Sequence, residues 1–453
     1  MVMGSVPEDV DVAVIGAGVG GYIAAIRAAE LGKSVALIEK HKLGGHCLNY
    51  ACIPSKTLLH ISDIFYNAKN SNKFGINVNS VSIDAKQMLD YRLSVSNKLE
   101  EGVGFLCRAH GIDIIKGEAS FLSSHSLQIT EGVIINFKKA IIATGSEPAE
   151  LNGFKFNDIN VIDYKKALML DKIPKTMAVI GAGFVGVEIG TLYAKLGSKV
   201  SIIARSNLLS SFDIDAVNIV KKRMESFGIN ILLNSKPLSY NNGILTLDNG
   251  VAVNAELVVI AIGLKPYTKN LSLENTKVDI DEKGFIKVDQ RLYTSDPNIL
   301  AIGDVIGMPM LAHKAMRQGI VAAESSQKDS FFDNTVIPSV VFSDPEIAVA
   351  GNISDPSLKI AKFPLTALGR AIAFNRTDGF VKIAYDDTNI IKGIEIVSDD
   401  ANALIAEAAL AIEMGANLED IADTIHPHPT FSESLQEAAE LGLGRPVHFF
   451  VKK

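Results

Sequence analysis

Cysteine, basic charge and long apolar stretches are all scarce in this sequence. Only three of its 453 residues are cysteine, which excludes a secreted protein held together by a disulfide framework. No apolar run reaches about 18 residues, so a membrane-spanning helix is not expected. The net charge of −7 argues against nucleic-acid binding. The first residues lack the basic-then-apolar pattern of a secretory leader, and we expect the cytoplasm as compartment.

Length and composition predict several well-packed domains. A chain of 453 residues exceeds one hydrophobic core, which makes two to four domains the expectation. The hydrophobic fraction is 47%, charged residues are 21%, and glycine occurs 36 times. These proportions are typical of a folded α/β protein rather than a disordered chain.

A glycine-rich turn near the N-terminus predicts a dinucleotide site. Residues 9–40 read as a buried strand, a glycine-rich turn, an amphipathic helix and a second strand. Gly16, Gly18 and Gly21 fill the G-x-G-x-x-G pattern, and Glu39 ends the second strand. Such glycines let the backbone approach a pyrophosphate, and the acid accepts hydrogen bonds from a ribose. A plain tight turn in a doubly wound sheet is the alternative.

The same pattern recurs in residues 175–205. Gly181, Gly183 and Gly186 stand at a constant offset of 165 from the first three glycines. A coincidental turn does not repeat through a helix and a second strand, so the chain has two dinucleotide-binding units. Ala204 stands where the first unit has its acid, and Arg205 follows. The two sites should therefore hold different dinucleotides, as in an electron relay.

Strands that run into glycine divide the chain further. They end at Gly145, Gly263 and Gly303, and after about residue 331 the pattern changes to antiparallel strands with one strong amphipathic helix. The predicted fold is α/β, with two doubly wound dinucleotide-binding domains and a C-terminal α+β domain. The predicted limits are 1–147 and 148–271 for the two binding domains, 272–334 for a segment completing the first site, and 335–453 for the C-terminal domain.

Two of the three cysteines, Cys47 and Cys52, lie five residues apart directly after the first unit. They can be buried structural thiols, or zinc ligands together with His46 and His60, although a second ligand pair of sensible spacing is missing. A redox pair needs a helix N-terminus or a cation beside it and an electron partner. The following residues 53–65 read as a helix, which favours the redox interpretation. Cys107 reads as a core residue.

The segment LGGHCLNYACIPSK, residues 43–56, resembles the redox-disulfide segment of the pyridine nucleotide–disulfide oxidoreductases, G-G-T-C-x-N-x-G-C-x-P-S-K. The resemblance covers nearly the whole chain. IGDVIGMPMLAHKA, residues 302–315, and the C-terminal HPHPTFSESL are similar to the dihydrolipoamide dehydrogenase branch. Two residues depart from the family pattern: His46 replaces a threonine, for which we expect a solvent-facing position, and Ala51 replaces a glycine.

The resemblance implies FAD at the first site and NAD at the second, with NADP possible and no metal. The residues it implies for cofactor binding are Gly16, Gly18, Gly21, Glu39, Lys40, Gly45, Lys56, Ala119, Thr144, Gly145, Ser146, Gly181, Gly183, Gly186, Ala204, Arg205, Gly263, Gly303, Asp304, Met310, Leu311, Ala312 and His313.

The resemblance also implies roles in the reaction. The Cys52 sulfur would face the flavin, and Cys47 would exchange with substrate. Lys56 would lie near the flavin and pair with Glu188, although an ordinary surface ion pair is the alternative. His428 matches the family's base, with Glu433 as its orienting carboxylate. Histidine suits this role because imidazole titrates near working pH. His426 is the rival base.

In the family this base comes from the other subunit, which implies a homodimer with the C-terminal domain as interface. The implied reaction is oxidation of dihydrolipoamide, carried on a lipoyl domain of a 2-oxo acid dehydrogenase or glycine-cleavage complex. The alternatives are a glutathione-reductase-like enzyme that uses NADPH, and a non-catalytic flavoprotein dimer. Mercuric reductase has a C-terminal cysteine pair that is missing here.

The sequence is ambiguous about the nicotinamide cofactor. Gly186 as third glycine and the family branch favour NAD. Against this, Ala204 removes the ribose-binding acid, and Arg205 offers a guanidinium for a 2′-phosphate. We expect NAD to be used with unusually weak discrimination against NADP, or even with a preference for NADP.

Overall fold

The computed structural model describes residues 8–130, 132–157, 159–326 and 328–450. The chain divides into two compact units, one formed by residues 1–173 and 260–333 and the other by residues 174–259 and 334–453. The first unit contains the first glycine-rich turn and both redox cysteines. The second contains the repeated turn and the C-terminal residues.

A seven-stranded sheet forms the centre of the first unit, in the order β3–β2–β1–β6–β5–β4 with β17 beside β6. The strands β1, β2, β3, β6 and β17 pair in parallel, and β4 and β5 extend the sheet antiparallel. Their bounds are β1 Glu8–Ile15, β2 Val35–Glu39, β3 Asp113–Lys116, β4 Ala119–Ser123, β5 Ser126–Ile129, β6 Ile134–Ile142 and β17 Ile299–Ala301.

Both faces of this sheet are buried, as a parallel sheet requires. Along β1, Val12 and Val14 pack into one hydrophobic cluster, while Ala13 and Ile15 pack into the cluster on the other side. Since both faces are buried, β1 and β2 are nearly continuous apolar runs in the sequence. Their carboxyl ends carry the glycine-rich turn and Glu39, which places both at one edge of the sheet.

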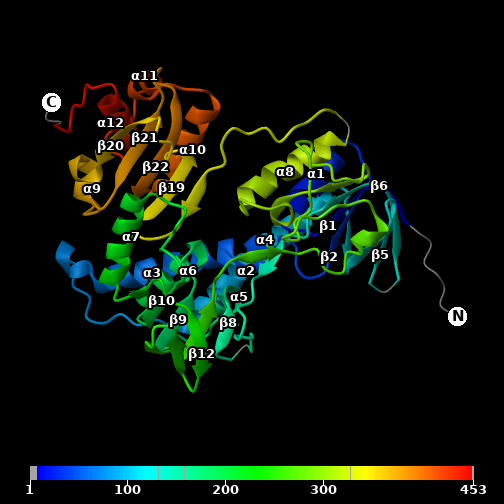
Figure 1. Cartoon of the computed structure of the whole chain (residues 1–453), viewed down its shortest axis with the longest axis horizontal. Coiled ribbons are helices and arrows are strands. Elements are labelled where there is room, and N and C mark those ends of the chain that lie inside the picture. Colours follow the sequence, from blue (N-terminus) through cyan, green and yellow to red (C-terminus); the bar gives the residue numbers. More distant parts are fainter. Residues whose placement is uncertain (1–7, 131, 158, 327, 451–453) are drawn as a thin grey trace. The chain divides into compact units, whose positions relative to one another are not determined.

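Helices α1 (Val19–Glu30) and α8 (Ala312–Ser325) lie against each other in this unit (Figure 1). The two helices approach so closely that a Cβ on Gly319 would lie 2.5 Å from the Gly20 carbonyl oxygen. The other helices and short strands of the unit are α2 Gly45–Tyr50, α3 Cys52–Lys69, η1 Ser71–Phe74, α4 Ala85–Ala109, β7 Ser146–Pro148, β8 Val161–Asp163, α5 Tyr164–Ala167, β16 Leu264–Pro266, η2 Leu273–Asn275 and η3 Gly303–Ile306.

The second unit begins with the repeated nucleotide fold. The strands β11, β10, β9 and β15 are neighbours in that order, and β9, β10 and β11 pair in parallel. Its elements are β9 Thr176–Ile180, α6 Phe184–Lys195, β10 Lys199–Ile203, α7 Ile214–Ser226, β11 Asn230–Leu232, β12 Pro237–Asn241, β13 Ile244–Leu247, β14 Ala252–Asn254 and β15 Leu257–Ile260.

The C-terminal part of the second unit is an antiparallel sheet in the order β18–β19–β22–β21–β20. Helix α10 packs on β19 and β22, and α12 packs on β20 and β21 (Figure 1). The bounds are β18 Ser339–Val341, β19 Glu346–Gly351, β20 Lys359–Pro364, η4 Leu365–Ala367, α9 Gly369–Ala373, β21 Phe380–Tyr385, β22 Ile391–Ser398, α10 Ala401–Glu413, α11 Leu418–Ala422 and α12 Glu433–Gly442.

The predicted fold class is confirmed: two parallel nucleotide folds are followed by an antiparallel sheet with helices. Cys107 is fully buried, as expected of a core residue. Among the helices that the structure describes, none has the length and apolar character needed to cross a bilayer. The predicted domain limits stay predictions.

Candidate active site

The first glycine-rich turn and Glu39 form one hydrogen-bonded unit. Gly16 has φ +99°, a conformation that side chains disfavour, and a Cβ there would lie 2.5 Å from the Ala143 carbonyl oxygen. Gly18 caps α1, and a Cβ on it would meet no atom within 4 Å, so the space beside it is open. The Glu39 carboxylate accepts the amide N–H of Ala17 at 2.8 Å. The acid is therefore held directly beside the turn.

The redox segment runs along the same turn. The Gly44 amide donates to the Ala17 carbonyl at 2.8 Å, and Gly18 and Gly44 form an isolated parallel bridge. Gly45 has φ +58°, and a Cβ there would lie 2.5 Å from the Gly18 Cα. Glycine is therefore required at this position, because the start of α2 lies directly against the dinucleotide turn.

Cys47 and Cys52 form a disulfide between α2 and the first residue of α3, with their Cα atoms 4.6 Å apart. Neither zinc ligation nor two separate buried thiols matches this bond. Ala51, between the two helices, has φ −135°, so the position accepts an alanine in place of the family's glycine. Cys52 begins an 18-residue helix, whose N-terminus favours a thiolate.

Lys56 and Glu188 belong to different units. Lys56 lies in the second turn of α3, and Glu188 lies on α6 with 7% of its surface exposed. Within its own unit, Glu188 accepts the amide N–H of Phe342 at 3.4 Å. The pairing of Lys56 with Glu188 stays a prediction.

Asp304 lies in η3 next to β7. Its carboxylate accepts the Ser146 hydroxyl proton at 2.6 Å. Burial raises the pKa of Asp304, and the Ser146 hydrogen bond and the Lys314 charge oppose that rise. The Lys314 ammonium donates to the carbonyls of Gly307 and Pro309 at 2.7 and 3.0 Å, which braces the loop before α8.

The other predicted contacts of this site lie on the same edge. Thr144 donates its hydroxyl to the Tyr267 carbonyl at 2.6 Å, and Gly303 donates its amide to the Gln318 side chain at 2.9 Å. The remaining predicted residues lie just after β6, at the start of β4 and at the start of α8: Gly145, Ala119, Met310, Leu311, Ala312 and His313.

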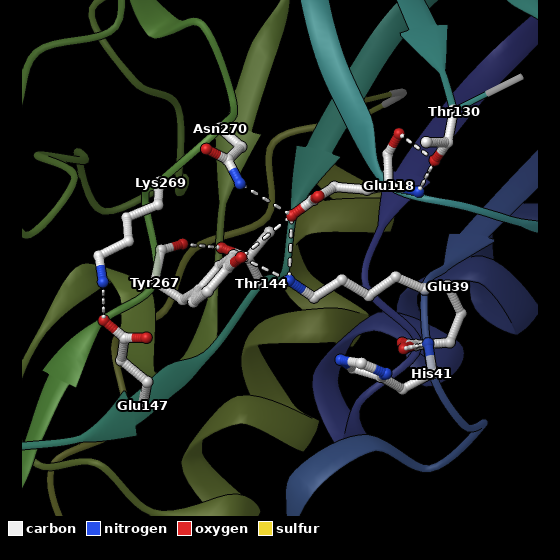
Figure 2. A network of polar contacts seen from close by, with 10 residues as sticks. Glu39, His41, Glu118, Thr130, Thr144, Glu147, Tyr267, Lys269 and Asn270 are labelled. Carbon is white, nitrogen blue, oxygen red and sulfur yellow. Dashed lines mark hydrogen bonds and ion pairs between the residues drawn. The ribbon is translucent and has the colours of Figure 1, made fainter. Parts of the chain in front are cut away.

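Lys40 belongs to a polar cluster that the sequence does not reveal. Its ammonium lies 3.0 Å from a Glu118 carboxylate oxygen and donates to the Tyr267 hydroxyl. The Tyr267 hydroxyl and the Asn270 amide donate to Glu118 at 3.0 and 3.5 Å. Figure 2 shows both groups directed at this carboxylate. Burial lowers the pKa of Lys40, but the Tyr267 and Glu118 contacts outweigh it and raise the pKa overall.

A cavity of about 580 Å³ adjoins this cluster. It is lined by Lys40, His41, Lys116, Gly117, Glu118, Thr130, Tyr267 and Asn270. Glu39 accepts the amide N–H of His41 at 2.7 Å, so the cavity lies next to the predicted ribose-binding carboxylate. Its place and its polar lining suit the adenosine end of a dinucleotide.

The second glycine-rich turn repeats the first in detail. Gly181 has φ +121°, Gly183 caps α6, and a Cβ on Gly186 would lie 2.0 Å from the Gly181 carbonyl oxygen. Ala204 is 8% exposed at the end of β10, whereas Arg205 is exposed and pairs with no carboxylate in the described chain. Gly263, with φ +116°, follows β15 in the first unit.

His428 and Glu433 form the predicted pair. The His428 Nδ1–H donates to Glu433 at 2.7 Å, and the other Glu433 oxygen accepts the Thr430 amide at 2.7 Å. Burial raises the pKa of Glu433, but these two hydrogen bonds outweigh it and lower the pKa overall. The His428 side chain is 78% exposed, and its Nε2 has no hydrogen-bond partner among the described residues. That nitrogen is available to accept a proton.

The rival histidine is occupied. His426 donates from Nδ1 to the Thr424 carbonyl at 2.8 Å and from Nε2 to Glu407 at 2.9 Å. Its side chain is only 4% exposed, and the Glu407 contact is the main reason that its pKa is raised. An imidazole that donates from both nitrogens has no lone pair left for a substrate proton.

His46 is not solvent-facing, and that expectation was wrong. Its ring is half-buried, stacks on Tyr164 and is hydrogen-bonded to the Tyr164 hydroxyl. Burial, the main cause, lowers the pKa of His46 to about 4. The sequence did not single out Tyr164, Tyr267, Glu118 or Lys314. Glu118 and Lys314 could have been inferred from their positions beside the predicted contacts Ala119 and His313. No signal in the sequence indicated Tyr164 or Tyr267.

Comparison with known proteins agrees with this architecture. Residues 10–319 match the pyridine nucleotide-disulphide oxidoreductase family, and residues 337–439 match the dimerisation domain of that family. The dihydrolipoyl dehydrogenase of Geobacillus stearothermophilus is 42% identical over 100% of both chains. The dihydrolipoyl dehydrogenase of Bacillus subtilis (strain 168) is 40% identical over 99% of both chains.

Solved structures show the same fold. The HOCl-induced flavoprotein disulfide reductase RclA from Escherichia coli superposes with a TM-score of 0.86 and 27% identity, over 95% of this chain and 99% of that one. LpdA from Mycobacterium tuberculosis superposes with a TM-score of 0.88 and 23% identity, over 96% and 99%. The family match extends over more than half of the sequence, and the chain belongs to the pyridine nucleotide-disulphide oxidoreductase family.

Proposed function

We propose that the chain oxidises dihydrolipoamide, carried on a lipoyl domain of a 2-oxo acid dehydrogenase or glycine-cleavage complex, and passes the electrons through FAD to a pyridine nucleotide. The observation that carries the proposal is the Cys47–Cys52 disulfide built against the glycine-rich turn of the first nucleotide fold. The full-length relatives named dihydrolipoyl dehydrogenase support this choice of substrate.

Family membership implies FAD and a pyridine nucleotide, and the first site fits FAD. Open space lies beside Gly18 and Gly145, where a Cβ would meet no atom within 4 Å. Glu39 would bind the adenosine ribose, and Asp304 would bind near the flavin end. Met310, Leu311, Ala312 and His313 would line that end. When bound, FAD takes two electrons from the reduced cysteine pair and delivers them as hydride to the nicotinamide.

The chain's own residues perform the thiol chemistry. His428 takes the proton of one substrate thiol at Nε2, while Glu433 holds Nδ1–H and stabilises the imidazolium. The substrate thiolate attacks the Cys47 sulfur, the Cys47–Cys52 bond breaks, and Cys52 leaves as a thiolate. A mixed disulfide then joins Cys47 to the substrate.

Ring closure completes this half-reaction. The second substrate thiol attacks the substrate sulfur of the mixed disulfide, which forms lipoamide and expels Cys47. His428 gives its proton to the Cys47 sulfur and takes the proton of the second thiol. The products are lipoamide, a Cys47 thiol, a Cys52 thiolate and protonated His428. Lys56, in its predicted pair with Glu188, would stabilise negative charge near the flavin.

The second site fits a pyridine nucleotide, and we propose NAD with weak discrimination against NADP. Gly181, Gly183 and Gly186 supply the pyrophosphate turn. Ala204 puts no carboxylate next to the 2′ position, and the exposed Arg205 guanidinium can bind a 2′-phosphate.

The proposed active form is a homodimer. The match of residues 337–439 to a dimerisation domain supports it, and in the family the histidine base comes from the second subunit. We retain the limits 1–147, 148–271, 272–334 and 335–453 for the FAD-binding domain, the nicotinamide-binding domain, the central segment and the interface domain. We retain the cytoplasm as compartment.

The second candidate is a disulfide reductase that runs in the opposite direction with NADPH. Ala204 and Arg205 favour it, because they remove the usual acid and supply a cation at the second ribose. The same cysteine pair and the same base would serve a disulfide substrate. The ratio of dihydrolipoamide oxidation to glutathione disulfide reduction separates the two candidates.

Anaerobic titration with dihydrolipoamide tests the function. The FAD-loaded protein should develop a long-wavelength absorption band from the Cys52 thiolate beside the flavin, and it should reduce NAD or NADP in steady state. Cys47→Ser and Cys52→Ser should abolish dithiol oxidation while FAD remains bound, whereas the buried Cys107→Ser should retain it. Wild-type turnover in either redox-cysteine variant would contradict the assignment.

A further inference from the structure

His46 and Tyr164 form a contact that joins two distant parts of the first unit. The two rings stack with centroids 5.5 Å apart and an interplanar angle of 12°. The Tyr164 hydroxyl is hydrogen-bonded to His46 Nε2 across a sequence separation of 118 residues. His46 precedes Cys47 on α2, and Tyr164 begins α5, so the contact ties the redox helix to a separate segment.

The backbone of Ser146 also lies beside the imidazole, and its influence raises the pKa of His46 against the effect of burial. The geometric hydrogen bond of the imidazole is the one between Nε2 and the Tyr164 hydroxyl.

Both partners are uncharged at neutral pH. Burial is the main cause that lowers the pKa of His46 to about 4, and the Lys165 charge adds to it. Burial also raises the pKa of Tyr164, with smaller contributions from the charges of Asp163 and Asp304. His46 consequently offers no cation that would turn Cys47 into a thiolate, so a local activating role does not fit.

The contact continues to the predicted flavin end. The backbone of Ser146 lies beside His46, and the Ser146 hydroxyl donates to Asp304 at 2.6 Å. The contact between α2 and α5 therefore adjoins β7 and η3. The path begins at the residue before the substrate-facing sulfur and ends at the carboxylate predicted to contact FAD.

We propose that the His46–Tyr164 pair is a hydrogen-bonded clamp that orients α2, and with it Cys47, relative to Ser146 and Asp304. His46 is a positioning residue in this role. The expected effect on turnover rests on the proposed function. The clamp itself is tested separately, by the reactivity of the Cys47 thiol. A large aromatic partner explains how histidine fits where the family pattern has threonine, since Tyr164 stacks on the imidazole and is hydrogen-bonded to its Nε2.

The first test measures Cys47 reactivity in the reduced, FAD-loaded protein. Tyr164→Phe keeps the ring and removes the hydroxyl, and His46→Asn removes the imidazole that stacks on Tyr164. Each should accelerate iodoacetamide alkylation of Cys47, mapped by mass spectrometry, by roughly 3- to 10-fold, the scale of one lost hydrogen bond. The double variant should match the singles rather than multiply them. His60→Asn, an exposed histidine on α3, should alkylate like wild type.

The second test separates positioning from catalysis. In both single variants kcat for dihydrolipoamide should fall by roughly 3- to 10-fold, the long-wavelength band should weaken, and the pH midpoint of kcat/KM should stay unchanged because His428 remains. Unchanged alkylation rates in both variants, or multiplied effects in the double variant, would overturn the clamp. A pH limb that disappears with His46→Asn would make His46 the base instead. A wild type inactive on dihydrolipoamide would refute the proposed substrate alone, since alkylation still tests the clamp.

Discussion

At the scale of single residues, hydrogen bonds distinguish two neighbouring histidines. His426 and His428 stand two apart, and each contacts a glutamate. His426 is enclosed and donates from both nitrogens, whereas His428 is exposed with Nε2 open. In the sequence, Glu433 at the family's spacing was the reason to prefer His428. The structure adds that Glu407, from α10, binds Nε2 of the alternative base His426.

Replacing His428 by glutamine should lower dihydrolipoamide turnover by about 10²-fold or more, the usual scale for a general base. Reduction of an artificial acceptor by the nicotinamide should stay nearly intact, because that half-reaction needs no thiol deprotonation. The measurement is kcat for both reactions in the same preparation. His426→Gln is the matched control. A greater loss of dithiol turnover in His426→Gln than in His428→Gln would reverse the assignment.

Glu395 is a fully buried carboxylate in β22, 3.7 Å from the Lys382 ammonium. Burial raises its pKa to about 7 from an ordinary 4.5, and the Lys382 charge opposes that rise. Between pH 4.5 and 7 the folded state keeps a proton that the unfolded state has released, so this residue makes the protein less stable as pH rises through that window.

Glu395→Gln should remove this contribution. The free energy of unfolding of the variant, relative to wild type, should increase from pH 5 to pH 8 when both are unfolded by urea at one protein concentration. The exposed Glu274→Gln should show no such trend. A difference between variant and wild type that is constant from pH 5 to pH 8 would show that Glu395 ionises normally.

At the scale of secondary structure, the two nucleotide-binding units differ at the end of their second strand. In the first unit β2 ends in Glu39, which the Ala17 and His41 amides hold at the glycine-rich turn. In the second unit β10 ends before Ala204, whose amide donates to the Leu232 carbonyl at 3.0 Å. The backbone course is preserved, but the carboxylate is missing.

Arg205→Ala and Ala204→Glu should both shift the ratio of kcat/KM for NAD over NADP toward NAD. Adding or removing one charged group at the ribose changes that ratio by roughly 10- to 100-fold. Steady-state kinetics with both nucleotides give the result, and Lys199→Ala, an exposed cation at the other end of β10, is the control. A wild type that prefers NAD by more than about 10³-fold, with no response to Arg205→Ala, would contradict this interpretation of the strand.

At the scale of the whole molecule, the proposed machinery is dispersed along the chain. The cysteine pair lies on α2 and α3 of the first unit, and His428 lies before α12 of the second. The family match to a dimerisation domain accounts for this separation if each active site combines residues of two subunits.

Mixed dimers test that arrangement. Homodimers carrying Cys47→Ser should be inactive and those carrying His428→Gln nearly so, but a mixed dimer has one intact site if the base crosses between subunits. Refolded mixtures should recover about a quarter of wild-type dithiol turnover on statistical pairing. Homodimers of each variant are the controls. Purified mixed dimers without any recovery would show that each site is built within one subunit.

The sequence alone was enough for the fold class, the two nucleotide units and the cysteine pair. Each depends on residues close together in the chain: apolar runs bury both faces of β1 and β2, glycines recur at fixed spacing, and Cys52 follows Cys47 by five positions. Local spacing of this kind is imposed by strand and turn geometry and is visible without a structure.

Contacts between distant segments were decided only by the tertiary structure. Tyr164 meets His46 across 118 residues, and Glu118 meets Lys40 across 78. His46 was expected to face solvent, and its neighbours in sequence do not indicate Tyr164 as a partner. Periodicity records which side chains share a face, but not which remote group lies opposite. The packing of complete segments determines that neighbour. Here it places His46, a departure from the family pattern, in a hydrogen-bonded pair with the buried Tyr164, next to the redox disulfide.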